Sequence, residues 1–316
     1  MKLRFEGENS MHPRVQLAGA PVSWGVDHMG RPNLPPWQQV FSEMAEAGFL
    51  YVELGPLGYL PQDASVIRNA MSERKLQVVG AALLEPLLDP AVTDRSLKAA
   101  RRLSRLISES GGKFLVIVDW VTPERGRTAG RPSDAPRLTG ERLSHFHWMF
   151  EEIGRISKKE FGVQAVAHAH GGTYLEFEDE IEALLAATDP DLVELAIDTG
   201  HSVFAGFDPT ALYEHHCERT TYVNFKDVDG VVLERANREK LSFLEAVDAG
   251  IFCKLGAGVV DLRAFTGTMM GHSFSGPAVI EQDRDPASPG DPLSDARQSI
   301  AFLKSIGLEA GMQKAV

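Results

Sequence analysis

The sequence predicts a single (β/α)8 TIM barrel, a closed cylinder of eight parallel strands with helices around it. Two observations lead to this α/β fold class. From Val15 onward, short apolar runs alternate with longer amphipathic ones, and eight such pairs account for the chain. No GxGxxG motif follows the first apolar run, where an open dinucleotide-binding sheet would carry one. We therefore expect residues 1–14 to form an N-terminal extension and residues 15–316 to form one barrel domain.

Each strand is expected where a short run rich in Val, Ile, Leu and Ala ends in a polar residue or a turn. A helix is expected where apolar residues recur at helical spacing between a start and a stop signal, as between Pro35 and Gly48. The expected strands are 15–22, 51–54, 76–84, 113–119, 163–168, 193–198, 222–226 and 278–281. The expected helices are 35–48, 63–74, 94–110, 141–161, 176–187, 209–217, 238–247, 262–270 and 292–306.

Two connections, residues 120–138 and 228–258, are longer than most loops between a strand and a helix. The first carries Arg125, Arg127 and Arg131, and it is either a cover over an active site or a mobile surface loop. The second contains the expected helix 238–247. Loops of this length often carry function, so both are candidates for contact with a ligand.

The composition, with 43% hydrophobic and 24% charged residues, is that of an ordinary globular protein with ample core. A formal charge of −12 argues against nucleic acid as a partner, because a phosphate-binding surface is basic. No apolar run approaches the ~18 residues of a membrane span, so no membrane partner is expected. Only two cysteines are present, Cys217 and Cys253, which favours a reducing cytoplasm.

Polar side chains follow the expected strands, and catalytic groups of such barrels stand at these strand ends. A mixture of imidazole and carboxylate ligands suits Mn²⁺, Co²⁺, Zn²⁺ or Fe²⁺, whereas carboxylates alone would favour magnesium or calcium. Any single one of these residues could equally cap a helix or bind a loop, but together they predict one divalent metal site. The strand-end residues are Trp24, Glu53, Glu85, Asp119, Trp120, His168, His170, Asp198, His201, Asn224, Lys226, Glu281 and Asp283.

Several motifs resemble those of the xylose isomerase-like barrels, a superfamily of sugar isomerases and epimerases, and within it those of the inosose dehydratases. The resemblance covers nearly the whole barrel. It rests on the segments 21–25 (PVSWG), 51–61 (YVELGPLGYLP), 168–173 (HAHGGT), 198–201 (DTGH), 226–228 (KDV) and 281–283 (EQD).

The resemblance implies metal ligands at His168, Asp198, Asn224 and Glu281. The commonest superfamily pattern is Glu-Asp-His-Glu, so His168 and Asn224 depart from it. Because an amide oxygen is a weaker ligand than imidazole, this chain either binds its ion less tightly, selects a harder ion, or recruits His170 or His201. The expected ion is manganese, cobalt or zinc, with magnesium as a further candidate.

The implied reaction is the removal of water from a cyclic polyhydroxy ketone, an inosose, through a metal-stabilised enolate. Lys226 is a candidate base or enolate stabiliser if burial lowers its pKa, and Glu53 is the other candidate base. Glu281 remains from the carboxylate pair of the epimerases. The plainer alternative for Lys226 is an ion pair with Asp227 or with a carboxylate at a neighbouring strand end. Expected substrate-binding residues are Trp24, Trp120, His170, His201 and Asp283.

Two other functions stay open at this point. One is isomerisation or epimerisation of an open-chain ketose on the same metal site, and the other is a barrel that binds a sugar or a partner protein without turnover. A nuclease is disfavoured because it would need a cationic face. The apolar residues Phe146, Met149 and Phe150 leave room for a homodimer.

Overall fold

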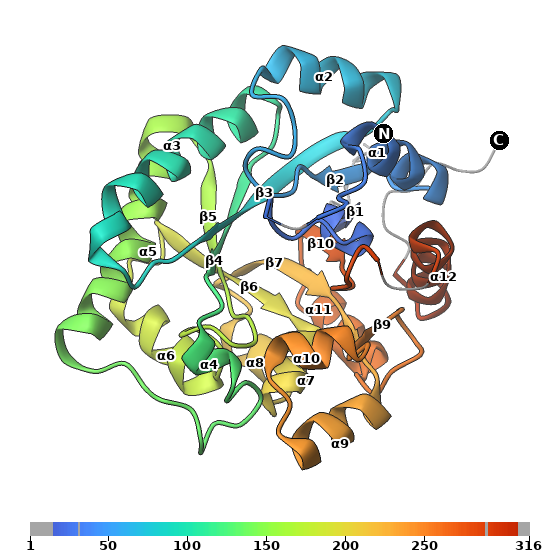
Figure 1. Cartoon of the computed structure of the whole chain (residues 1–316). Coiled ribbons are helices and arrows are strands. Elements are labelled where there is room, and N and C mark those ends of the chain that lie inside the picture. Colours follow the sequence, from blue (N-terminus) through green and yellow to red (C-terminus); the bar gives the residue numbers. More distant parts are fainter. Residues whose placement is uncertain (1–14, 31, 288–289, 309–316) are drawn as a thin grey trace, which may run out of the picture.

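Eight parallel strands close into a barrel in the order β1-β10-β7-β6-β5-β4-β3-β2, which confirms the predicted fold class (Figure 1). The computed structural model describes residues 15–30, 32–287 and 290–308, so the expected N-terminal extension lies outside the described residues. The barrel strands are β1 (Val15–Gly19), β2 (Tyr51–Glu53), β3 (Gln77–Glu85), β4 (Phe114–Asp119), β5 (Gln164–His168), β6 (Val193–Asp198), β7 (Thr220–Phe225) and β10 (Gly276–Ile280). That residues 15–316 act as one domain stays a prediction.

Helices surround the barrel and lie close to their expected positions (Figure 1). They are α1 (Trp37–Ala47), α2 (Ala64–Glu73), α3 (Thr93–Glu109), α5 (Gly140–Phe161), α6 (Glu178–Ala187), α8 (Pro209–His216), α11 (Leu262–Gly271) and α12 (Pro292–Ser305). Among the helices of the described ranges, none combines the length and the apolarity that crossing a bilayer requires.

The structure differs from the expected elements mainly in the connections. Instead of a plain turn after β6, a short helix α7 (Thr199–Ala205) follows, because the side chain of Asp198 accepts a hydrogen bond from the backbone N–H of His201 at 2.7 Å and caps the first turn. The first strand is shorter than expected, since a 3-10 helix η1 (Pro21–Trp24) replaces its end. Another 3-10 turn, η2 (Pro90–Val92), precedes α3.

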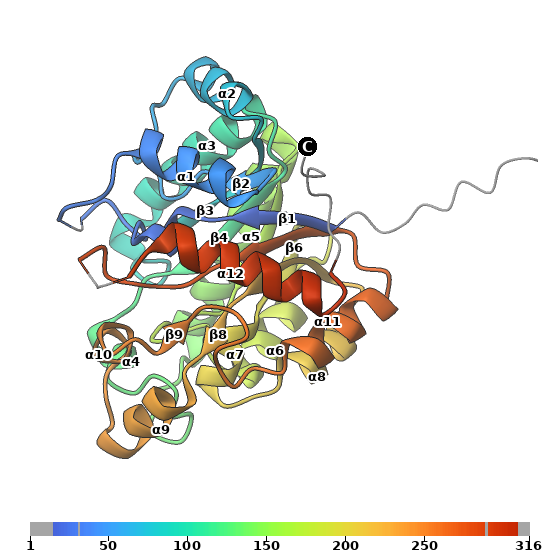
Figure 2. The same cartoon turned by 90° about the vertical axis from the view of Figure 1, so that its right-hand side faces the viewer.

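The two long connections carry secondary structure of their own. The first contains the short helix α4 (Pro123–Gly126). The second holds α9 (Gly230–Glu239) and α10 (Phe243–Asp248) rather than one helix at 238–247, and its ends pair as the antiparallel strands β8 (Asp227–Val228) and β9 (Phe252–Cys253). Figure 2 shows α4, α9, α10 and β9 at the same end of the barrel.

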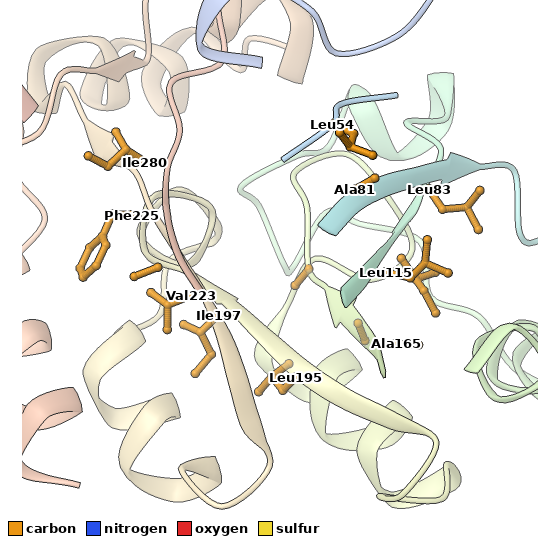
Figure 3. Packing of buried hydrophobic residues seen from close by; sticks show 14 of the residues in the cluster. Leu54, Ala81, Leu83, Leu115, Ala165, Leu195, Ile197, Val223, Phe225 and Ile280 are labelled. Atoms are coloured by element: carbon orange, nitrogen blue, oxygen red, sulfur yellow. The ribbon is translucent and has the colours of Figure 1, made fainter. Parts of the chain in front are cut away.

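Side chains alternate along each strand between the helices and the barrel axis. On β6 and β7, Leu195, Ile197, Val223 and Phe225 pack toward the helices (Figure 3). A separate buried cluster contains residues from the strands and from the segment just after β1, with none from the α-helices, and it therefore fills the barrel interior. Its members are Ala18, Ala20, Val79, Val116, Val118, Val166, Ala196, Tyr222 and Val279.

The apolar face of α5 does not support the expected dimer contact. Phe146 is 1% exposed, and Met149 and Phe150 are 0% exposed, because they pack against the barrel strands of the same chain. The residues that suggested a homodimer therefore belong to the core of the protomer.

Candidate functional site

A cavity opens at the end of the barrel where the strands finish. The space inside it, about 570 Å³, includes solvent at its open mouth. The residues from the second half of the chain that line it are all polar or charged: His168, His170, Lys226, Glu281 and Asp283. The expected strand-end residues of this half therefore do meet at one place.

Strand alternation explains which of these side chains face the cavity. Ala196, Tyr222 and Val279 point into the barrel, so Asp198, Asn224 and Glu281, each two residues further along, are on the same face. Asp198 and Asn224 lie opposite each other in the pairing of β6 with β7. The same alternation turns Glu85 and Asp119 away, so these two strand-end carboxylates do not enter the cavity.

Glu85 and Asp119 instead hold neighbouring segments in place. Glu85 accepts a hydrogen bond from the hydroxyl of Ser96 at 2.8 Å. The Asp119 carboxyl accepts backbone N–H bonds from Leu87 and Tyr174, each at 3.2 Å, and its burial raises its pKa to about 7. These groups stabilise loops around the mouth rather than contact a ligand.

Lys226 lies at the centre of a cluster of charged side chains that also contains Asp198, Glu281 and Asp283. Its ammonium lies 2.9 Å from Asp283 Oδ1, 3.2 Å from Asp198 Oδ2 and 3.2 Å from Glu281 Oε2, and it is 1% exposed. The Nζ atom also lies 5.0 Å from the ring centre of Phe252. Lys226 is thus paired with three carboxyl groups inside the site, which agrees with the expected ion pair to a carboxylate at a neighbouring strand end. It is not paired with Asp227, the other expected partner, which binds backbone groups elsewhere.

Asp227 organises the turn after β9. Its carboxylate accepts backbone N–H bonds from Gly256 at 2.8 Å, Gly258 at 3.0 Å and Val260 at 3.1 Å. Consecutive residues of the chain, Lys226 and Asp227, therefore serve opposite purposes, one in the site and one in the scaffold.

Lys226 does not meet the condition set for its role as a base, namely a pKa that burial lowers. Burial by itself would lower this pKa, but the carboxylates of Asp198, Asp283 and Glu281 outweigh it and raise the pKa above its ordinary value. The side chain therefore stays an ammonium at neutral pH. In this state it can stabilise negative charge, but it has no lone pair with which to remove a proton.

The three carboxyl groups around Lys226 do not titrate alike. Burial would raise the pKa of Asp198 and of Asp283, yet the nearby ammonium of Lys226 holds both below their usual range. Burial raises the pKa of Glu281 to about 8, although Lys226 opposes it. At neutral pH the cluster therefore contains two carboxylates, one ammonium and one protonated carboxyl group.

The two other histidines of the site, His170 and His201, are neutral at pH 7. Burial lowers the pKa of His170 well below its ordinary value and also lowers the pKa of His201. His170 Nδ1 lies 3.0 Å from the carbonyl oxygen of Gly171, which places a proton there and leaves Nε2 as an acceptor. The Nδ1 atom of His201 lies 3.2 Å from the backbone N of Gly171, and its Nε2 atom lies 3.1 Å from the ammonium nitrogen of Lys226 and 3.5 Å from Asp283 Oδ2.

The donor atoms present fit one divalent ion. His168 Nε2 and Asp198 Oδ2 lie 3.5 Å apart and both are buried; His168 Nε2 has no hydrogen-bond partner among the described residues, whereas Asp198 Oδ2 is paired with the ammonium of Lys226 at 3.2 Å. Both amide atoms of the fully buried Asn224 also lack such a partner within the described ranges. One imidazole nitrogen and one amide without hydrogen-bond partners, beside a carboxylate, form a donor set that a divalent cation would complete.

Of the expected ligands, His168 and Asp198 come together as donors, and His201 joins them in a group whose ligand atoms all lie within 4.8 Å of one another. His201 Nε2 lies 3.1 Å from the ammonium of Lys226, which favours a contact of this histidine with substrate or with a ligand's neighbour over a bond to the metal. Glu281 is connected to this group by its ion pair with Lys226, which is itself paired with Asp198. A second group of this kind, His170, His201 and Asp283, shares His201 with the first.

Glu53 enters the cavity from β2 and is 3% exposed. Burial raises its pKa, although the Tyr222 hydroxyl, which donates a hydrogen bond to Glu53 Oε1, opposes the shift. Sequence reasoning missed Tyr222. The signal was available, because Tyr222, Asn224 and Lys226 follow one another at the two-residue spacing of a strand face.

The two tryptophans expected to stack on a substrate do not line the cavity. Trp24 donates a hydrogen bond from Nε1 to Glu43 at 2.6 Å and packs near Phe49 and Ile280, outside the mouth. Trp120 is 40% exposed and contacts the ring of His28 at 5.6 Å between centroids. The position of Trp24 at the end of an expected strand did not show which way its side chain points, since the 3-10 helix η1 turns the chain there.

The aromatic rings that pack behind the histidines of the site, here called the aromatic wall, come from the long connection after β7 and do not line the cavity. Phe243 on α10 lies 5.0 Å from the ring of His170, and Phe252 on β9 lies 5.0 Å from the ring of His201. Gly200 is a further residue that sequence reasoning missed, because a Cβ there would lie 2.6 Å from Cγ of Lys226. The first turn of α7 therefore leaves the room that the lysine stem occupies.

A buried arginine ties the 120–138 connection to the loop that carries His170. Arg125 is 0% exposed and donates to Glu180 at 2.6 Å and to Glu176 at 3.3 Å. Glu176 in turn accepts backbone N–H bonds from Gly130 at 2.7 Å and Gly172 at 3.1 Å. This network identifies the connection as an ordered part of the mouth and does not agree with a mobile surface loop.

Comparison with known proteins agrees with the barrel fold. Residues 41–306 match the model of a family described as xylose isomerase-like TIM barrel. Among solved structures, D-allulose 3-epimerase from Methylomonas sp. superposes with a TM-score of 0.69 at 16% identity over 93% of this chain and 98% of that one. An L-ribulose 3-epimerase superposes with a TM-score of 0.69 at 14% identity over 92% of this chain and 94% of that one.

Three curated relatives align along most of their length. An inosose dehydratase of Geobacillus thermodenitrificans is 31% identical over 91% of this chain and 96% of its own, and one of Geobacillus kaustophilus is 30% identical over 89% and 91%. The rhizopine catabolism protein MocC of Rhizobium meliloti is 30% identical over 97% of this chain and 93% of its own.

Proposed function

The chain belongs to the xylose isomerase-like TIM-barrel family, and from this premise we propose that it removes water from a cyclic polyhydroxy ketone of the inosose class. It is a sugar-modifying enzyme, either a carbon-oxygen lyase of the inosose dehydratase kind or a sugar isomerase or epimerase. The dehydratase assignment is supported by curated relatives with that name at about 30% identity along most of the chain.

The observation that carries the proposal is the buried ammonium of Lys226 beside the donors of His168 and Asp198. We assign one divalent ion to His168 and Asp198, with Asn224 completing the set, while Glu281 stays outside it, because a carboxylate bound to the ion could not hold the proton that the leaving group needs. When bound, such an ion acts as a Lewis acid toward the ketone oxygen. Lys226 donates a hydrogen bond to the oxygen that gains negative charge as the α-proton leaves, because a fixed ammonium in a buried site stabilises developing charge strongly.

Two carboxyl groups have the properties that the proton transfers need. In this proposal Glu53 removes the α-proton, since the raised pKa of its carboxyl makes the ionised form a stronger base, and Tyr222 fixes its direction. Glu281, whose pKa is raised to about 8, gives its proton to the leaving β-hydroxyl. The C–H electron pair forms the new C=C bond, the C–O bond breaks, and water departs. His170, His201 and Asp283 orient the ring hydroxyls.

The test is an ultraviolet assay of the purified protein loaded with Mn²⁺ or Co²⁺. We expect 2-keto-myo-inositol to yield an absorbing dione product, and we expect Glu281→Gln to lose this activity. Glu85→Gln is the matched control, because that strand-end carboxyl faces away from the cavity and should leave turnover unchanged. Absence of product with every divalent ion would refute the dehydratase assignment.

A second reaction is favoured by one observation, namely that Glu53 and Glu281 both line the same cavity. Two carboxyl groups could remove and return a proton on an open-chain ketose, as an epimerase requires. Incubation of ketoses in deuterated water separates the two reactions. Deuterium incorporation that Glu281→Gln abolishes, without loss of water from 2-keto-myo-inositol, would favour the epimerase.

A further inference from the structure

The cavity wall opposite the charged cluster is apolar. Its side chains from the first half of the chain include Val22, Val26, Pro56, Leu84, Val116 and Val118, and its two carboxyl groups are Asp27 and Glu53. Asp27 accepts a hydrogen bond from the backbone of His28 at 2.7 Å, and Glu53 accepts one from Tyr222. The apolar side chains therefore dominate this half of the wall.

The part of this wall that β3 and β4 contribute is one continuous apolar patch. Leu84 pairs with Val118 and Ala82 pairs with Val116 in the register of β3 with β4, so the four side chains are neighbours on the inward face. In the closed strand order β3 stands four places from β7, and β4 stands four places from β10. The patch thus lies directly across the barrel from Lys226 and Glu281.

A hydroxyl group pressed against this patch would lose its hydrogen bonds to water and gain none from the wall, which is unfavourable. We propose that the preferred substrate is a cyclic polyol with an apolar group on the edge remote from its ketone. A ring hydroxyl replaced by hydrogen, or capped as a methyl ether, has this chemistry. The inference rests on the proposed function only for the class of ring and for the placement of the ketone near Lys226.

The cavity presents different chemistry on its two sides. Polar contacts would then come from one side of the ring and apolar contacts from the other. Such an arrangement discriminates between a parent polyol and its capped derivative by the one group that differs.

The test is calorimetric titration of the Mn²⁺-loaded protein with myo-inositol and with its monodeoxy and mono-O-methyl derivatives. We expect at least one derivative to bind about tenfold more tightly than the parent. Val118→Thr, which adds one hydroxyl to the patch at nearly constant volume, should bring this ratio close to one. Val166→Thr is the matched control, because Val166 is buried in the barrel interior below the cavity lining and should leave the ratio unchanged.

The inference is overturned if myo-inositol binds as tightly as every derivative, if no cyclitol binds, or if Val118→Thr leaves the ratio unchanged. Its failure is distinct from failure of the dehydratase assignment. Dione formation from 2-keto-myo-inositol together with tightest binding of the parent polyol would keep the reaction and reject the apolar edge. Tighter binding of a derivative without dione formation would keep the apolar edge and reject the reaction.

Discussion

The two halves of the barrel mouth are built on the same backbone pattern but have opposite chemistry. The half from β5 to β10 places Lys226, three carboxyl groups and three histidines on the cavity side, and the half from β1 to β4 places mainly Val, Leu, Ala and Pro there. The charged half needs an internal counter-ion, since its carboxylates are buried. The apolar half needs only close packing. The contrast indicates that the charged half carries most of the chemistry, to which β2 adds the proposed base Glu53, and that the apolar side chains of the other half select the shape of the substrate.

The largest effect is expected where the charged half loses a metal donor. Asp198→Asn keeps a side-chain oxygen to cap α7 but removes the carboxylate, so we expect kcat/KM for the dehydration to fall about a thousandfold. Metal content measured by elemental analysis should fall in parallel. An Asp198→Asn enzyme with full metal content and normal turnover would contradict the assignment of the metal site to the charged half.

The next effect concerns the counter-ion. Lys226→Met leaves three buried carboxyl groups without their cation, so we expect the free energy of unfolding at pH 8 to fall by about 3 kcal/mol. In the parent protein the lowered pKa values of Asp198 and Asp283 contribute stability above their unfolded-state pKa of about 4, and this contribution is lost only as the pH falls through the still lower folded-state values.

In Lys226→Met the largest charge that opposes burial is gone and we expect these pKa values to rise, although His201 still lowers both, so the variant should lose stability as the pH rises and show its smallest deficit near pH 5. Denaturant titrations at pH 5 and pH 8 measure both quantities. A deficit that does not depend on pH would mean that Lys226 contributes through packing rather than through charge.

A smaller effect tests the room made for the lysine stem. In Gly200→Ala the new Cβ would lie 2.6 Å from Cγ of Lys226, and we expect a loss of about 2 kcal/mol in the free energy of unfolding together with lower kcat. Gly267→Ala on α11 is the control, since a Cβ there meets no described atom within 4 Å and should raise helix stability by about 0.5–1 kcal/mol. Equal behaviour of the two variants would contradict the assigned role of Gly200.

The smallest effect sharpens the choice of ion within the charged half. The unpartnered amide of Asn224 offers an oxygen donor, whereas Asn224→His offers imidazole, which suits zinc better than an amide does. We expect the affinity for Zn²⁺ relative to Mn²⁺ to rise about tenfold in the variant, as measured by competition with a chromophoric chelator. An unchanged ratio would place Asn224 outside the metal site.

Much of the fold could be read from the sequence because the strands and helices follow hydrophobic periodicity, and that periodicity is a local property. The eight barrel strands were placed within a few residues of their positions. The short helix α7 was missed because its start depends on a single cap, Asp198, within a segment of only seven helical residues. The 228–258 connection was misread because its two helices lack a strong apolar stripe.

The convergence of His168, Asp198, Lys226, Glu281 and Asp283 could also be predicted, since all follow strands whose ends meet at one end of a parallel barrel. The directions of the side chains could have been predicted more fully. Counting in steps of two from the buried interior positions separates Glu281 from Glu85 and Asp198 from Asp119.

By itself, the sequence determined the barrel, the strand ends that meet, and the mixture of imidazole and carboxylate groups among them. The tertiary structure alone decided that Lys226 remains a cation, that Trp24 packs outside the mouth, and that Phe243 and Phe252 form the aromatic wall. The physical reason is that a pKa or a cavity wall depends on the groups nearest in space. For Lys226 these are Asp198, Glu281 and Asp283, which stand 28, 55 and 57 positions away in the chain.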